Sequence, residues 1–118
     1  MVGASNRPAR DSHRVIHFLQ SRGYHVIPVN PRLAGQPLAG QTVRATLADI
    51  TEPVDMVEVF RRPDAVPSIV EQAIEIGART LWLQLGVINE AAAARAANAG
   101  LEVVMDRCPA IEIPRLGL

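Results

Sequence analysis

The chain has 118 residues, of which 48% are hydrophobic and 20% are charged, the composition of an ordinary globular domain. Its 12 basic residues balance its 12 acidic ones, so the net charge does not favour nucleic acid or a membrane surface as a partner. Every basic residue is arginine, which excludes Schiff-base chemistry on lysine and a P-loop lysine. The length favours one domain over residues 1–118.

The single cysteine and the absence of long apolar segments exclude further classes of protein. Cys108 alone forms neither an internal disulfide nor a multi-thiolate zinc site. No apolar run approaches the roughly 20 residues of a membrane span. The first residues also lack the basic-then-apolar layout of a signal peptide, so we expect a cytoplasmic protein.

The first part of the chain predicts a strand, a helix and a second strand. Residues 1–5 have the character of the last residues of a strand that runs into a turn. We hypothesise that the true start lies upstream or that this strand survives only as a stub. A helix follows Asp11 and Ser12, either of which can cap it, and ends at Gly23. The short apolar segment 24–29 has the length of a buried strand.

The rest of the chain alternates between helices and strands. Apolar, often β-branched segments predict further strands at 54–60, 80–85 and 101–105. Helices are expected at 43–48, 64–77 and 89–100. Strands separated by helices require a parallel sheet with helices on both faces. The sequence therefore predicts an α/β fold, a Rossmann-like doubly wound parallel sheet of about five strands with a truncated first strand.

In such a sheet, ligands bind at the carboxyl ends of the strands, near the point where the strand order reverses. The residues expected there are Gly3, Ala4, Ser5, Asn6 and Arg7; Asn30, Pro31 and Arg32; Phe60, Arg61 and Arg62; and Gln84 and Gly86. The first group is a strand-to-helix turn whose helix N-terminus favours an anion such as pyrophosphate. It contains one glycine and not the full dinucleotide-binding pattern, so a plain connecting loop is the alternative.

Arginine follows the second predicted strand, where NAD-binding folds place an acidic residue for the ribose hydroxyls. Arg32 would pair with a phosphorylated ribose through charge-assisted hydrogen bonds. The ligand should then carry a ribose phosphate, as coenzyme A (CoA) and NADP do. Arg61 and Arg62 follow the third strand, where they could bind phosphate or stack on adenine beside Phe60. Solvated arginines are the alternative at all three positions.

Histidine and cysteine offer weaker signals. His13 and His17 have the spacing of a metal pair, but no third ligand completes a site, so we expect ordinary histidines and no metal. Cys108 is either a small buried hydrophobic residue or a reactive thiol whose pKa Arg107 lowers. No catalytic triad or carboxylate pair is evident, so no catalytic residue is assigned.

Five segments carry a resemblance to a known family, at residues 2–5, 23–31, 53–63, 82–86 and 104–109. The chain resembles the stand-alone bacterial CoA-binding proteins, which are similar to the CoA-binding domain of the succinyl-CoA synthetase α subunit. The likeness covers nearly all 118 residues. Its most specific parts are Phe-Arg-Arg-Pro at 60–63 and Asp-Arg-Cys-Pro at 106–109, where the synthetases carry Pro-Asn-Cys-Pro.

The resemblance implies a role for each group of residues. The turn at 3–6 holds the pyrophosphate, and 30–32 meets the ribose phosphate. Residues 60–62 lie along the adenine and phosphates, while Gln84 and Gly86 border the pantetheine arm. The synthetases' phosphorylated histidine lies outside this domain, so acyl-CoA synthesis by this chain alone is not implied.

We therefore expect a protein that binds CoA or an acyl-CoA and has no catalytic apparatus of its own. An NADP-binding oxidoreductase fragment, or an acyl-CoA synthetase-like subunit that needs a partner chain, is the alternative. The expected partner is a small-molecule nucleotide, with no nucleic acid and no membrane. A homo-oligomer and an enzyme partner chain both stay open.

Overall fold

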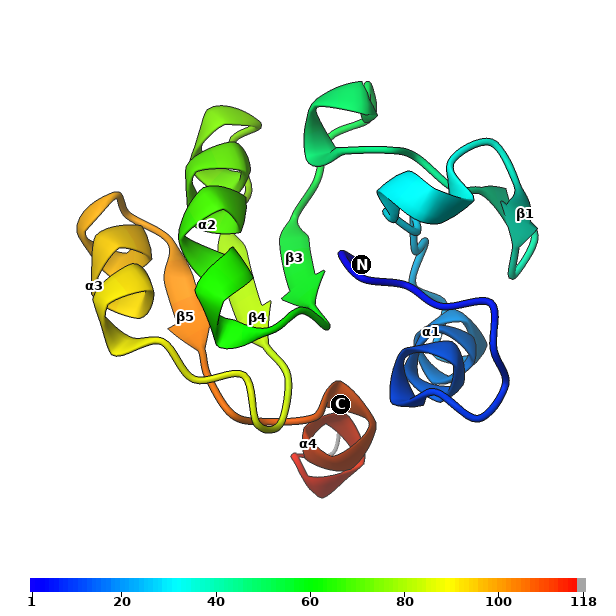
Figure 1. The fold of residues 1–118 in the computed structure, drawn as a ribbon. Helices are drawn as coiled ribbons and strands as arrows, with labels where there is room; N and C mark the ends of the chain where they lie inside the picture. The colour runs from blue at the N-terminus through cyan, green and yellow to red at the C-terminus, as the bar shows by residue number, and fades with distance from the viewer. Residues whose placement is uncertain (117–118) are drawn as a thin grey trace.

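The computed structural model describes residues 1–116, which form an α/β arrangement (Figure 1). Its helices are α1 (Asp11–Ser21), α2 (Val66–Glu75), α3 (Glu90–Asn98) and α4 (Pro109–Arg115). Its strands are β1 (Pro37–Leu38), β2 (Gln41–Thr42), β3 (Met56–Val59), β4 (Thr80–Leu83) and β5 (Glu102–Val104). Short 3-10 turns occupy Pro31–Leu33, Leu47–Asp49 and Pro63–Ala65. No helix in the described part is long and apolar enough to cross a bilayer.

Three parallel strands form the main sheet, in the order β3-β4-β5. Val2 extends this sheet beyond β3, because it forms single parallel bridges with Val59 on one side and with Val29 on the other. The Val2 amide donates to the Glu58 carbonyl oxygen at 2.8 Å, and the Phe60 amide donates to the Val2 carbonyl oxygen at 2.8 Å. The start of the chain therefore lies centrally, beside β3 (Figure 1).

The predicted sheet of about five strands is corrected to three strands extended by single bridges. The segment 24–29, predicted as a full strand, contributes only one bridged position, at Val29. On one side it is hydrogen-bonded to Met1–Gly3 through the backbone of Ile27 and Val29. On the other side Val29 forms a single bridge with Arg44. The segment is nevertheless buried from Val26 to Val29, as a strand interior would be.

The helix predicted at 43–48 is wrong. A hairpin precedes this segment, in which β1 pairs with β2 antiparallel around Ala39 and Gly40. Both turn residues have positive φ, 51° and 77°, as in a two-residue hairpin turn of type I′. The Thr46 side chain then forms a capping box with Asp49, which closes a 3-10 turn in place of a longer helix.

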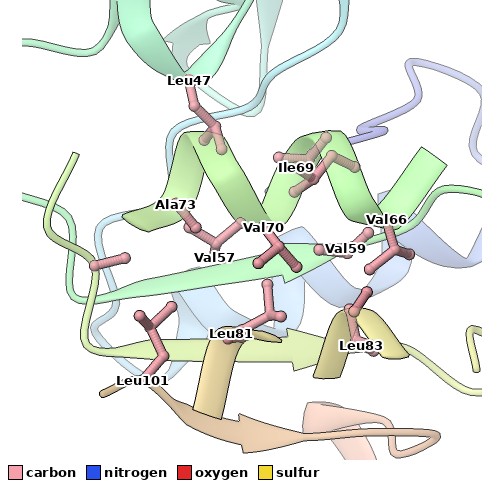
Figure 2. Close-up of a cluster of buried hydrophobic side chains, with 14 of the residues drawn as sticks. Leu47, Val57, Val59, Val66, Ile69, Val70, Ala73, Leu81, Leu83 and Leu101 are labelled. Carbon is pink, nitrogen blue, oxygen red and sulfur yellow. The ribbon is translucent and has the colours of Figure 1, made fainter. Parts of the chain in front are cut away.

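Two layers of helices cover the two faces of the sheet, as the doubly wound prediction requires. On one face, α2 and α3 bury a cluster that includes Val57, Val70 and Leu81, and Figure 2 shows these side chains packed between α2 and the strands. On the other face, α1 and α4 contribute Ile16 and Ile113 to a second cluster. The predicted helices at 64–77 and 89–100 are confirmed as α2 and α3, whereas α4 was not predicted.

Candidate functional site

The turn after Val2 packs directly against the end of β3. Gly3 has a φ of +85°, and a Cβ atom at this position would lie only 2.4 Å from the Phe60 carbonyl oxygen. The Gly3 amide donates to the Val29 carbonyl oxygen at 2.9 Å. Only glycine fits here, because any side chain meets both an unfavourable φ and rigid backbone. The turn therefore lies between the end of β3 and the end of the segment 24–29.

The sequence predicted that this turn leads into the N-terminus of a helix. In the structure, the exposed residues 6–10 separate the turn from α1. The helix is preceded by Arg10 as N-cap residue without a side-chain cap, so neither Asp11 nor Ser12 caps it as predicted. Instead, the Ser12 hydroxyl oxygen accepts the Ser5 amide at 3.1 Å. That hydrogen bond fastens the turn to the first turn of α1.

A second segment lies beside this turn and is hydrogen-bonded to it. The Asn30 side-chain amide donates to the Ala4 carbonyl oxygen at 2.9 Å, and its oxygen accepts the Arg32 backbone amide at 2.9 Å. Pro31 and Arg32 are exposed at the start of a 3-10 turn. The structure thus brings together the two segments to which the sequence assigned the pyrophosphate and the ribose phosphate.

The three residues after β3 separate in space. Phe60 is half-buried against the cluster beneath α1 and α4. Arg61 is exposed, and its side chain passes the Gly3 turn. Arg62 is also exposed and lies 3.8 Å from the Asp64 carboxylate. Arg61 is therefore the arginine of this pair that the geometry places against the turn.

A cavity of about 310 Å³ lies between these segments and α2. Pro31 and Arg61 line it, as do Thr46, Ser68 and Gln72, which the sequence reasoning missed. The Gln72 side-chain amide donates to the Ser68 hydroxyl oxygen at 3.3 Å. The spacing of four residues places Ser68 and Gln72 on the same side of the predicted helix. The sequence does not show which loop this side of the helix faces.

Gln84 and Gly86 follow β4 at the same edge of the sheet. Gln84 is only 6% exposed, and its side-chain oxygen has no hydrogen-bond partner among residues 1–116. The Gly86 amide donates to an Asp106 carboxylate oxygen at 2.7 Å. Asp106 holds a φ of +60°, and the Trp82 indole N–H donates to the Arg107 carbonyl oxygen at 2.8 Å. These contacts fasten the segment after β4 to the segment after β5.

The histidines and the cysteine considered from the sequence do not form a metal site in the described residues. The rings of His13 and His17 contact each other, with centroids 4.6 Å apart. Within residues 1–116, no group of three or more histidine, cysteine or acidic side chains is close enough to hold a metal ion. Cys108 is buried as the residue that precedes α4.

A different polar group lies within the sheet, at the third of the four positions of β3. Glu58 is only 2% exposed, and neither carboxyl oxygen has a hydrogen-bond partner in the described chain. Burial raises the pKa of Glu58 to about 9, while the nearby Met1 amine acts in the opposite direction. The carboxyl lines a mostly apolar cavity of about 370 Å³ together with Ile27 and Trp82. The sequence showed this carboxylate without indicating its environment.

The layered parallel sheet, with its glycine turn and arginines at one edge, defines a Rossmann-like α/β domain. The sequence profile of the CoA binding domain matches residues 1–114, and the chain belongs to this family. The resemblance noted from the sequence is thereby confirmed.

Individual relatives agree with this assignment. The chain is 39% identical over 108 residues to the uncharacterized protein YneT of Bacillus subtilis strain 168, a match that spans 92% of this chain and 78% of that one. The cell-free protein ID.343 from Thermus thermophilus has a similar structure, with a TM-score of 0.94, 38% identity and coverage of 98% and 86% of the two chains. A hypothetical protein from Pyrococcus horikoshii OT3 gives a TM-score of 0.94, 37% identity and coverage of 99% and 81%.

Proposed function

We propose that this protein binds CoA or an acyl-CoA across the carboxyl ends of its strands. The observation that carries the proposal is the convergence of the Gly3 turn, Arg32 and Arg61 at one edge of the sheet, in a chain of the CoA-binding domain family. Arginine suits phosphate because its planar guanidinium donates several charge-assisted hydrogen bonds. CoA presents a pyrophosphate and a ribose phosphate, and this edge offers a place for each.

The proposed placement follows the segments in space. The pyrophosphate lies against the turn at 3–7, with the ribose phosphate at 30–32. The adenine enters the cavity lined by Pro31 and Arg61. Apart from Arg61 the lining side chains are uncharged and mostly apolar, and Arg61 can stack on a heterocyclic base. The proposed site consists of Gly3, Ala4, Ser5, Asn6, Arg7, Asn30, Pro31, Arg32, Phe60, Arg61, Arg62, Gln84 and Gly86.

The pantetheine arm follows the edge of the sheet past β4. Its two amide N–H groups are hydrogen-bond donors, and the Gln84 side-chain oxygen is a buried acceptor without a partner in the described residues. A buried unpaired acceptor is unfavourable by about 1–3 kcal/mol, so an amide donor from the ligand would be stabilised there. This pairing gives Gln84 a role that a solvated loop residue would lack.

Native mass spectrometry of the purified protein, followed by calorimetric titration, tests the proposal. We expect a dissociation constant for CoA at least about tenfold lower than that for dephospho-CoA, because Arg32 pairs with the ribose phosphate. Tighter binding of NADP than of CoA would support the oxidoreductase alternative and contradict the proposal. The variant Arg32→Ala should lose this preference. Arg79→Ala is its matched control and should keep it, because Arg79 is an exposed arginine just before β4, away from the carboxyl edge of the sheet.

A further inference from the structure

Asn30 connects two segments of the proposed site by one side chain. Its amide nitrogen donates to the Ala4 carbonyl oxygen at 2.9 Å, within the turn that follows Val2. Its side-chain oxygen accepts the backbone amide of Arg32 at 2.9 Å, within the turn that follows Val29. Both ends of the amide are thus engaged with protein backbone, which makes the side chain a bridge between the two turns.

The backbone around Asn30 is itself held in place. The Asn30 amide donates to the Arg44 carbonyl oxygen at 2.9 Å, and the Leu33 amide donates to the Asn30 carbonyl oxygen at 3.1 Å. On the other side, Gly3 is anchored to Val29 at 2.9 Å. The two turns are therefore joined at their bases by the sheet, and the Asn30 side chain joins them again further out, where the ligand phosphates would lie.

We propose that Asn30 is a positioning residue that fixes the distance between the pyrophosphate turn and the ribose-phosphate segment, and that it does not contact the ligand itself. The inference rests on the proposed CoA site and changes one assignment within it, since the sequence placed Asn30 among the ligand contacts. Two subsites held at a fixed distance bind a ligand that spans both more tightly than two subsites that move independently.

The chemistry of the bridge requires asparagine. One end of the side chain must donate to a carbonyl oxygen while the other accepts an N–H, and an amide does both. Serine retains an acceptor of the kind that caps a short helical turn, but it is too short to bridge to Ala4 as well. Asn30→Ser therefore removes the bridge and leaves the Pro31–Leu33 turn with a cap.

The test compares intact CoA with probes that occupy one subsite each. Adenosine 3′-monophosphate probes the ribose-phosphate segment, and inorganic pyrophosphate probes the turn. For Asn30→Ser we expect CoA affinity to fall about tenfold or more, because the two subsites lose their fixed distance. Each single-subsite probe should bind within about twofold of the wild type, measured by NMR titration. A mere loss of folded protein would weaken all three ligands by a common factor.

Asn89 supplies a matched control. Its side-chain amide donates to the Pro63 carbonyl oxygen at 3.0 Å, and its oxygen accepts the Ala92 amide at 3.0 Å, so it makes the same kind of bridge elsewhere. Asn89→Ser should leave CoA affinity within about twofold of wild type, since it leaves the distance between the two phosphate subsites unchanged.

Two results overturn the inference while leaving the proposed function intact. One is an unchanged CoA affinity in Asn30→Ser and in Asn30→Ala, which would mean that the bridge has no role in binding. The other is a loss of affinity for one single-subsite probe as large as that for CoA while the second probe binds as it does to wild type, which would mean that Asn30 contacts the ligand directly. Failure of the wild-type protein to bind CoA at all overturns both proposals together.

Discussion

The loops at the carboxyl edge and the interior of β3 give their polar side chains opposite surroundings. At the carboxyl ends, side chains such as Asn30 and Asp106 are hydrogen-bonded to the protein's own backbone, while Arg32 and Arg61 lie exposed. Within β3, Glu58 is buried without a hydrogen-bond partner among residues 1–116, and burial raises its pKa to about 9. The difference teaches that the loops of the candidate site are held in place by the protein's own hydrogen bonds. The interior of β3 instead contains an unfavourable buried carboxyl group that keeps its proton.

The largest expected effect comes from Gly3→Ala. The new Cβ would lie 2.4 Å from the Phe60 carbonyl oxygen at a φ of +85°. A left-handed non-glycine residue and an overpacked contact together lower the free energy of unfolding by about 2–5 kcal/mol. Chemical denaturation measures this change, and CoA titration should show binding lost with it. Gly77→Ala is the control, because its φ is +76° but open space surrounds it, and a loss of the same size there would contradict the packing argument.

Glu58→Gln tests the buried carboxyl group within β3. The pKa of the wild-type carboxyl is about 9 when folded, against an ordinary value of 4.5. Between those values the unfolded chain has released the proton that the folded chain still holds, so stability falls as pH rises through this window. The neutral glutamine removes this loss, and the variant should gain about 2–3 kcal/mol over wild type between pH 4.5 and pH 7. Thermal denaturation at pH 4.5 and pH 7 measures the stability of both proteins. If the stability changes equally in wild type and variant between these pH values, Glu58 does not have a raised pKa.

Arg32→Ala tests the proposed ribose-phosphate contact. Loss of one charge-assisted contact should weaken CoA binding by about 1.5–3 kcal/mol, or roughly 10- to 100-fold, and dephospho-CoA binding much less. Calorimetric titration of both ligands measures the difference. Equal losses for the two would mean that Arg32 does not recognise the ribose phosphate.

The smallest effect is expected for Asp106→Ala. The substitution removes the carboxylate that accepts the Gly86 amide at 2.7 Å and leaves alanine at a φ of +60°. We expect about 1–2 kcal/mol of lost stability and a weaker effect on CoA affinity than for Arg32→Ala. Asp106→Asn retains both the acceptor and tolerance of this φ, so it should behave as wild type in denaturation.

Much of this architecture follows from local sequence patterns, and the exceptions have specific causes. The apolar face of α2 and the short apolar segment of β4 predict those elements directly. The hairpin escaped prediction because Ala39 adopts a positive φ that its residue type does not favour. The helix α4 was missed, and it contains Pro114, a residue that normally argues against a helix interior.

Part of the candidate site could likewise be predicted from local sequence, and part could not. Parallel topology alone predicts that the segments after the strands converge, and the structure brings the Gly3 turn, Asn30 and Arg61 together. Ser68 and Gln72 were not predicted because they approach this edge through the packing of α2, which depends on residues far away in the sequence. The bridging role of Asn30 also depends on a partner in another loop, which its own neighbours in the sequence do not reveal.

The link between Trp82 and Arg107 gives the protein an internal optical reporter. The sequence contains one tryptophan, so all indole emission comes from a ring whose N–H donates to a backbone carbonyl beside the loop of Asp106. Any event that loosens this loop changes the polarity and hydrogen bonding around that ring. Steady-state fluorescence at a single excitation wavelength therefore follows the state of this edge of the sheet without a label, on the untouched protein and in real time.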